Sequence, residues 1–167
     1  PYTTLFRSSM VRCLHQSGIT VAHSFDIRER ISFYEKLCRS HGALLFEDYE
    51  EVRGWMDWLM DTLDSMEHPK CLCHIDANVD NFLFFEDGSV KLLDWEYAGM
   101  CDPVMDVSMC AIYSYYNEED MERLFRLYLQ REPSEDELFA LYANAALGGF
   151  LWCLWAVYKS ILGDEFG

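Results

Sequence analysis

Polar side chains gather between residues 74 and 94 in a pattern that could support phosphoryl transfer. His74, Asp76 and Asn81 have the spacing H-x-D-x-x-x-x-N, and Asp94 ends an apolar run 13 residues after Asn81. One carboxylate can accept or orient the proton of an attacking hydroxyl, while an amide oxygen and a second carboxylate can hold Mg²⁺ against phosphates. These residue types therefore predict a magnesium-dependent site, and the alternative is a polar turn capped by Asp and Asn.

Two short apolar runs must position these side chains. Residues 82–85 and 90–93 are separated by Glu-Asp-Gly-Ser, which predicts a β-hairpin. We expect the run 82–85 to be buried and to anchor the hairpin, because an anchored hairpin would let Asp76 and Asn81 meet Asp94.

Helix signals lie on both sides of the hairpin. Asp26 can cap a helix that ends near Ser40, and residues 47–66 have the pattern of a second helix. Asp102 before a proline, Asn117 before three acidic residues, and a capping box that opens at Ser134 mark three further helix starts. In the second helix, the side chains that we expect to face inward are Val52, Trp55, Trp58, Leu59 and Leu63.

This layout predicts one mainly helical domain of the α+β class with a small hairpin. Residues 1–9 show no periodicity, so we expect a non-native or disordered lead before a domain over residues 10–167. Residues 138–158 are 21 positions without a charge, a length that could cross a membrane. Asn144 and the Gly148-Gly149 pair favour a helix buried in a soluble core, so we expect no stable membrane insertion.

The composition indicates which classes of partner and which cellular compartment suit the chain. A formal net charge of -16 argues against nucleic acid, because phosphate binding needs clustered Lys and Arg. The acidity suits a cationic or metal-chelated ligand, although solubility alone also explains it. The seven cysteines lack the spacing of a disulfide framework, and no secretory leader is visible, so the expected compartment is the reducing cytoplasm. Cys71, Cys73 and His74 could suggest zinc, but a second ligand pair at zinc-finger spacing is missing, so no metal is expected there.

The segments CHIDANVDNFLF, VKLLDWEYAG and DPVMDVS together resemble the catalytic segment of choline kinases, within the wider group of choline/ethanolamine kinases and aminoglycoside phosphotransferases. The resemblance extends over residues 10–167 and implies the C-terminal lobe of a protein-kinase-like fold that uses ATP and Mg²⁺. By this resemblance Asp76 is the catalytic base, and Asn81 and Asp94 are the magnesium ligands. His74 would support the loop, and Asp106 would brace it through backbone hydrogen bonds, unless Asp106 is a solvent-facing helix acid. Asn78 and Asp80 would shape the loop.

The segment GGFLWCLWAVY carries a pair of tryptophans that could recognise a substrate. Trp152 and Trp155, three residues apart, share a helix face. They form either a core stripe or a surface for a quaternary ammonium, which is recognised by aromatic ring faces. FLWCLW is similar to the substrate helix of choline kinases, and Tyr97 matches a further aromatic of that site. Glu96 could add negative charge nearby, or form a structural ion pair instead.

Some parts of a complete kinase are missing from this sequence. The chain has no G-x-G-x-x-G, and its lysines are Lys36, Lys70, Lys91 and Lys159, so we expect that the N-terminal ATP lobe is absent and that the C-terminal end is clipped. The expected function is transfer of the ATP γ-phosphate to the hydroxyl of choline, giving phosphocholine, with little or no activity in this chain alone. The alternatives are a kinase of ethanolamine, another amino alcohol or an aminoglycoside, and a non-catalytic module that binds quaternary ammonium groups.

Overall fold

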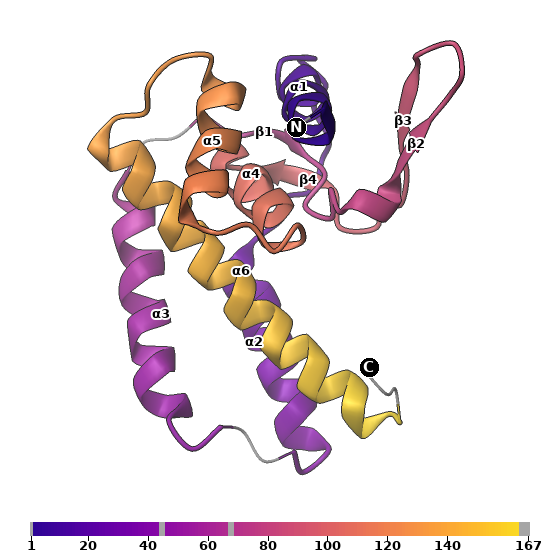
Figure 1. Cartoon of the computed structure of the whole chain (residues 1–167). Coiled ribbons are helices and arrows are strands. Elements are labelled where there is room, and N and C mark those ends of the chain that lie inside the picture. The colour runs from indigo at the N-terminus through magenta and orange to yellow at the C-terminus, as the bar shows by residue number, and fades with distance from the viewer. Residues whose placement is uncertain (1, 44–45, 67–68, 164–167) are drawn as a thin grey trace. The chain divides into compact units, whose positions relative to one another are not determined.

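The computed structural model describes residues 2–43, 46–66 and 69–163, which fall into two compact units (Figure 1). The first unit comprises residues 1–25 and 68–145, and the second comprises 26–67 and 146–167. The first contains α1 (Tyr2–His15), β1 (Cys71–Cys73), the 3₁₀ turn η1 (Val79–Asn81), β2 (Phe82–Phe84), β3 (Val90–Leu92), β4 (Gly99–Cys101), α4 (Pro103–Ile112), α5 (Glu118–Leu129) and the start of α6 (Glu135–Ile161). The second contains α2 (Ile27–Ser40), α3 (Tyr49–Asp64) and the rest of α6. The prediction of a mainly helical α+β fold is confirmed.

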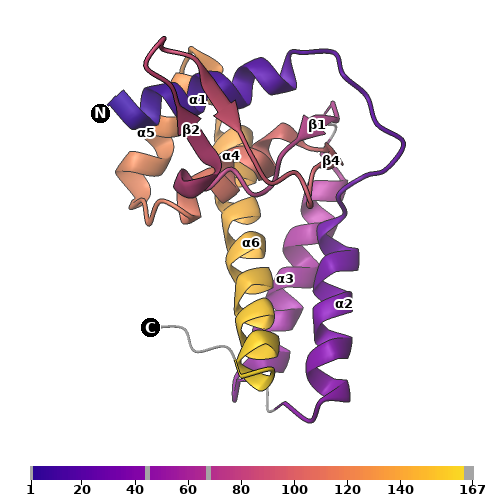
Figure 2. The ribbon, with the colours of Figure 1, turned by 90° about the vertical axis from the view of Figure 1, so that its right-hand side faces the viewer.

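The core of the first unit forms where α1, α4 and α5 pack together, and α1 and α4 also pack against β1 (Figure 2). Helix α4 is buried on every side from Val104 to Ala111. Val11 from α1 and Phe125 from α5 are also fully buried. A short helix that is buried all round is typical of the centre of a domain, so α4 is the element around which the unit is built.

Capping residues set the starts of the helices as predicted. Asp26 accepts a hydrogen bond from the Glu29 N–H at 3.1 Å, and Asp102 accepts one from the Val104 N–H at 2.8 Å. Asn117 caps α5 in the same way. Each cap satisfies a backbone N–H that has no partner inside the helix.

Residues 2–9 differ from the expected disordered lead, because they form the first turns of α1. Arg7 is buried, and its guanidinium donates to the Ser114 hydroxyl and, at 2.7 Å, to the Tyr116 hydroxyl. Ser8 is buried beside it. The partners of Arg7 are more than 100 positions away in the sequence. No local pattern could therefore have indicated that the helix begins so early.

Two pairs of short strands make up the β structure. β1 and β4 are antiparallel, with Cys71 opposite Cys101 and Cys73 opposite Gly99. Gly99 also lies against the chain at Ser24, which forms a parallel bridge with Met100. A Cβ on residue 99 would lie 2.7 Å from the backbone nitrogen of Phe25. Neither β1 nor β4 could be predicted from the sequence, because three residues are too few to show an alternating pattern.

We expect Gly99→Ala to lower the free energy of unfolding by about 1–3 kcal/mol, the range for forced overpacking. The clash is with backbone atoms, which cannot rotate away as a side chain can. Urea unfolding followed by circular dichroism measures the change. The control is Gly54→Ala in α3, where a Cβ meets no atom of the described residues within 4 Å and the better helix former should stabilise by about 0.5–1 kcal/mol. Equal effects of the two substitutions would contradict this account.

The predicted hairpin is confirmed, with β2 and β3 antiparallel and Gly88 at φ +81° in the turn. Its burial was predicted incorrectly. Phe82 is buried, whereas Leu83, Phe84 and Phe85 are 43%, 52% and 43% exposed. The strands are only three residues long, and Phe84 meets α1 through an edge contact with Phe6, with ring centroids 6.1 Å apart. One aromatic residue, rather than the whole run, therefore anchors the hairpin.

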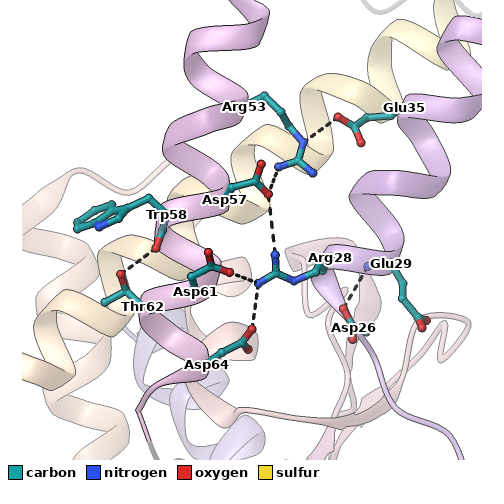
Figure 3. Close-up of polar contacts among 10 residues, drawn as sticks. All are labelled: Asp26, Arg28, Glu29, Glu35, Arg53, Asp57, Trp58, Asp61, Thr62 and Asp64. Atoms are coloured by element: carbon teal, nitrogen blue, oxygen red, sulfur yellow. Dashed lines mark hydrogen bonds and ion pairs between the residues drawn. The ribbon is translucent and has the colours of Figure 1, made fainter.

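In the second unit, ion pairs join α2 to α3 (Figure 3). Arg28 on α2 donates to Asp61 and Asp64 on α3, each at 2.9 Å. Arg53 on α3 donates to Glu35 on α2 at 2.8 Å. The α6 helix joins the same unit through the stacked rings of Tyr49 and Phe150, whose centroids are 5.8 Å apart.

The inward face of α3 differs from the one we predicted. Tyr49, Met56 and Met60 are buried, while Trp55 and Trp58 are 59% and 52% exposed and pack against each other. Both faces of α3 carry apolar side chains at helical spacing, so periodicity alone could not distinguish them. The ion pairs Arg53–Glu35 and Arg28–Asp61 join α3 to α2.

Among the residues that the structure describes, one helix, α6, is long and apolar enough to cross a membrane by length and composition. Half of its most apolar window is buried inside the structure, which is also the property of a core helix in a soluble protein. The predicted capping box is confirmed at its start. The Ser134 hydroxyl accepts from the Glu137 N–H at 3.2 Å, and the Glu137 carboxylate accepts from the Ser134 N–H at 2.8 Å.

We expect Glu137→Gln to cost about 1 kcal/mol of stability near neutral pH, because glutamine keeps a capping oxygen but loses the charge that pairs with Arg131 and favours the helix N-terminus. The Arg131 guanidinium, with help from the Ser134 N–H, lowers the pKa of Glu137 to about 2. A carboxylate with a depressed pKa contributes stability above its unfolded pKa of about 4.3, and that stability is lost as the pH falls toward the folded pKa. The difference between wild type and variant should therefore shrink between about pH 5 and pH 2.

Urea midpoints measured across this pH range test the prediction. Glu135→Gln is the matched control, since Glu135 is an exposed acid in the same first helical turn. A wild-type advantage over Glu137→Gln that stays constant down to the lowest pH would show that the carboxylate charge does not contribute.

Candidate active site

The segment that follows β1 is held in an unusual backbone conformation. Ile75 has φ +72° and is buried. A β-branched residue is strained in the left-handed region, so its surroundings must hold it there. The N–H groups of His74 and Ile75 both donate to the Asp106 carboxylate, at 2.8 and 2.6 Å. Asp106 therefore fixes the direction in which the loop leaves the strand.

Asp106 lies on α4 with no exposed surface, which excludes a solvent-facing helix acid. Its carboxylate makes a third contact, with Nε2 of His15 at 3.0 Å. The other ring nitrogen of His15 is 2.8 Å from the Tyr128 hydroxyl. Sequence reasoning missed His15 and Tyr128, because they come from α1 and α5, far along the chain from the loop. No spacing signal could have found them.

The Asp76 carboxylate accepts hydrogen bonds from two asparagines. Its Oδ1 accepts from the amide of Asn78 at 3.1 Å, and its Oδ2 accepts from the amide of Asn81 at 2.9 Å. The Asn81 amide also donates to the backbone carbonyl of Asp76 at 2.8 Å. Two donors fix the orientation of the carboxylate, and a carboxylate held in this way can accept a proton from a nearby hydroxyl.

Asn78 and Asp80 have the loop-shaping geometry that the resemblance implies. The side-chain oxygen of Asn78 accepts from the N–H groups of Asp80 and Asn81 at 2.8 and 3.2 Å, and so caps η1. Asp80 is exposed. The cap turns the chain so that Asn81 can reach back to Asp76.

Asp94 is positioned through the residue before it. The Leu93 N–H donates to the Asn81 carbonyl at 2.8 Å, and the Leu93 carbonyl accepts from Nε2 of His74 at 2.8 Å. Asp94 itself is exposed and has φ +57°, a conformation that Asp tolerates better than most residues. Leu93, at the end of β3, is therefore hydrogen-bonded both to Asn81 and to His74.

Asn81 and Asp94 offer oxygen donors of the kind that Mg²⁺ takes. The amide nitrogen of Asn81 is engaged by Asp76, which leaves its side-chain oxygen as the atom for a cation. Asp94 is exposed and follows Leu93, whose N–H donates to the Asn81 carbonyl. The residues present therefore fit a magnesium ion.

His74 is a fully buried support of this loop. Its ring lies edge-on to Trp95, with centroids 4.7 Å apart, and its Nε2–H donates to Leu93. Glu96 and Tyr97 follow in the turn before β4, where Glu96 is exposed and Tyr97 is half-buried. The structure thus gathers His74, Asp76, Asn81, Asp94 and Asp106 in the first unit.

Trp152 and Trp155 belong to the second unit, on the later part of α6. Both are half-buried, and their rings pack edge to face with centroids 4.9 Å apart. The ammonium of Lys159 lies 5.7 Å from the centroid of the Trp155 ring. One aromatic face of this pair therefore already binds a cation from the chain itself.

Comparisons with known proteins agree with this chemistry. The model of the phosphotransferase enzyme family matches residues 13–159. Protein LicA of Haemophilus influenzae is 27% identical over 163 residues, which cover 92% of this chain and 47% of that protein. The chain thus spans about half the length of this relative.

Two solved structures share the fold over nearly all of this chain. A choline/ethanolamine kinase family protein from Mesorhizobium loti is 25% identical with a TM-score of 0.89, covering 100% of this chain and 57% of the other. The choline kinase LicA from Streptococcus pneumoniae is 27% identical with a TM-score of 0.83, covering 99% and 58%. Their likeness extends over both units of the chain.

Proposed function

The chain belongs to the phosphotransferase enzyme family, and we propose that it is the catalytic and substrate-binding lobe of a choline kinase-type enzyme. In this reaction the hydroxyl of choline attacks the γ-phosphorus of ATP, the bond to the bridging oxygen breaks, and phosphocholine and ADP leave. One observation carries the proposal: Asp76 is held by Asn78 and Asn81 beside the strand end that carries Asp94.

Each residue of the first unit has a separate role in this proposal. Asp76 accepts or orients the proton of the attacking hydroxyl. Asn81 and Asp94 would hold Mg²⁺, which when bound neutralises charge on the phosphates. His74 and Asp106 keep the loop in place and do not touch the reacting atoms.

The phosphates of ATP need donors that these 167 residues do not supply. Kinases of this architecture use a glycine-rich loop and a lysine on a strand, and the chain contains no G-x-G-x-x-G. We assign residues 10–167 to the carboxy-terminal lobe and attribute the phosphate donors to an amino-terminal lobe. The isolated chain is then inactive or nearly so. The free state of all seven cysteines supports a reducing, cytoplasmic location, and the net charge of -16 supports a cationic substrate and no nucleic acid.

Choline is the substrate that the aromatic pair favours. A quaternary ammonium has no N–H donor and is bound by ring faces, as the Trp155 ring binds the Lys159 ammonium. On the resemblance to choline kinases, we also propose Tyr97 and Glu96, an aromatic and an acid of the first unit, as substrate-binding residues. An aminoglycoside would be held mainly by carboxylates, whereas the primary ammonium of ethanolamine prefers hydrogen-bond acceptors but can also sit on aromatic rings, as that of Lys159 does. A second candidate is a non-catalytic module that binds quaternary ammonium groups.

We expect Trp155→Ala, in the enzyme that carries both lobes, to raise the KM for choline about 2- to 30-fold, as one cation–π contact predicts. The KM for ATP should stay unchanged, because the phosphates are bound elsewhere. Steady-state kinetics with choline, ethanolamine and an aminoglycoside measure both constants. The matched control is Trp58→Ala, which removes an exposed tryptophan of α3.

Three outcomes of this experiment would redirect the proposal. A loss of ATP use with choline affinity intact would overturn the substrate assignment. A preference for ethanolamine or an aminoglycoside in the wild type would select the alternative kinase. Saturable choline binding in calorimetry, with no turnover even with both lobes present, would favour the binding module.

A further inference from the structure

A second cluster of metal-binding side chains lies in the first unit, apart from the proposed magnesium ligands. A ring nitrogen of His15 and the thiols of Cys71 and Cys73 all lie within 4.8 Å of one another. None of the three has a role in the phosphoryl transfer proposed above. His74, the histidine next to these cysteines in sequence, points instead to Leu93 and Trp95.

The strand geometry explains why the two thiols meet. Cys71 and Cys73 are two residues apart on β1, so their side chains project from the same face. Their sulfur atoms are 3.8 Å apart. Two sulfurs bound to one tetrahedral zinc at about 2.3 Å are themselves about 3.8 Å apart. The pair thus already has the separation that a zinc ion imposes.

The environment of His15 prepares its ring as a ligand. Its side chain is only 3% exposed, and Nε2 faces the buried carboxylate of Asp106. In the neutral ring with its proton on Nε2, toward this carboxylate, the lone pair would be on Nδ1, which lies 2.8 Å from the Tyr128 hydroxyl. A carboxylate behind a histidine is the usual second partner of a metal-bound imidazole. A cation would take the place of the Tyr128 proton.

We propose that His15, Cys71 and Cys73 bind a thiophilic divalent cation of the Zn²⁺ class. Two thiolates and a neutral imidazole would balance the charge of the ion, so no net charge is buried. The fourth position would go to water or to Cys101, which lies opposite Cys71 in the β1–β4 ladder. Soft sulfur donors distinguish this site from the oxygen donors of Asn81 and Asp94. Cys71 is half-buried and gives the ion a route in.

Such an ion would also stabilise the loop that carries Asp76. His15 contacts Asp106, and Asp106 holds the backbone of His74 and Ile75. A ligand that binds only the folded chain raises its stability. Zinc should therefore raise the melting temperature of the chain, and it should slow amide exchange at His74 and Ile75.

Titration of the reduced, metal-free 167-residue chain with Co²⁺ alone tests the site. We expect one equivalent to bind, with a thiolate-to-cobalt absorption band that Zn²⁺ abolishes. Cys71→Ser and Cys73→Ser should each weaken binding at least about 100-fold, since even the loss of a second-shell partner costs about 10- to 100-fold. Cys13→Ser and Cys153→Ser are matched controls, because those thiols are exposed and outside the cluster. Their titrations should equal that of the wild type.

The site is overturned if the band is absent, or if the control variants weaken it as much as Cys71→Ser does. Circular dichroism shows whether each variant folds. For variants that do not fold, alkylation of the wild-type chain decides. One equivalent of Zn²⁺ should protect Cys71 from alkylation while Cys13 is still modified, and equal modification of Cys71 with and without Zn²⁺ would contradict the proposal.

Discussion

Asp106→Ala is expected to lower the free energy of unfolding by about 3–5 kcal/mol, because the variant leaves several buried donors without an acceptor. The carboxylate accepts from the backbone of His74 and Ile75 and contacts His15, and none of its surface is exposed. Each buried donor that loses its partner costs about 1–3 kcal/mol. The strained φ of Ile75 would also lose the contact that holds it.

Urea unfolding followed by circular dichroism measures this loss, and amide exchange at His74 and Ile75 reports it locally. The matched control is Ser108→Ala on the same helix. Ser108 is equally buried but makes a single neutral hydrogen bond, to the Leu141 carbonyl at 2.9 Å, so we expect about 1 kcal/mol. If Asp106→Ala cost no more than Ser108→Ala, the carboxylate would not be the brace of the loop.

The features that could be predicted from sequence are those whose causes are local. The helix starts at Asp26, Asp102, Asn117 and Ser134 depend on a side chain that caps a backbone N–H two or three residues away. The hairpin turn depends in the same way on Gly88 and its neighbours. The polar loop could be recognised because its groups lie within a few residues of one another.

Features that depend on distant contacts could not be predicted. The partner of Asp106 on α1 is 91 residues away, and the partner of His15 on α5 is 113 residues away. A long sequence separation also hid the His15–Cys71–Cys73 cluster, since the sequence places only His74 beside the two cysteines and predicts no metal there. The exposure of Trp55 and Phe84 shows a second limit of prediction from sequence. Hydrophobicity indicates that burial of a side chain is favourable, but it does not say which side chains are buried in the fold.

Asp76→Asn, in the enzyme that carries both lobes, is expected to lower kcat about 10²- to 10⁴-fold, the usual contribution of a positioned general base. The KM values for ATP and choline should change little, because asparagine keeps the size of the side chain and neither substrate is bound mainly through it. Steady-state kinetics measure the loss. Asp80→Asn is the matched control, since Asp80 lies on the same loop but is exposed, and only its backbone N–H bonds to the Asn78 side chain.

A structural role for Asp76 would give a different pattern from a catalytic one. Its carboxylate accepts from Asn78 and Asn81, so removing the charge should cost the isolated chain about 1–3 kcal/mol of stability, an effect that urea unfolding measures separately. A base gives a large loss of kcat in protein that remains fully folded. A loop-shaping residue gives a loss of kcat only in proportion to the folded fraction. If folded Asp76→Asn kept more than about a tenth of kcat, the loss would be smaller than the loss expected for a general base. The proton of the hydroxyl would then have to go to another group, and the segment 74–81 would be a capped polar turn.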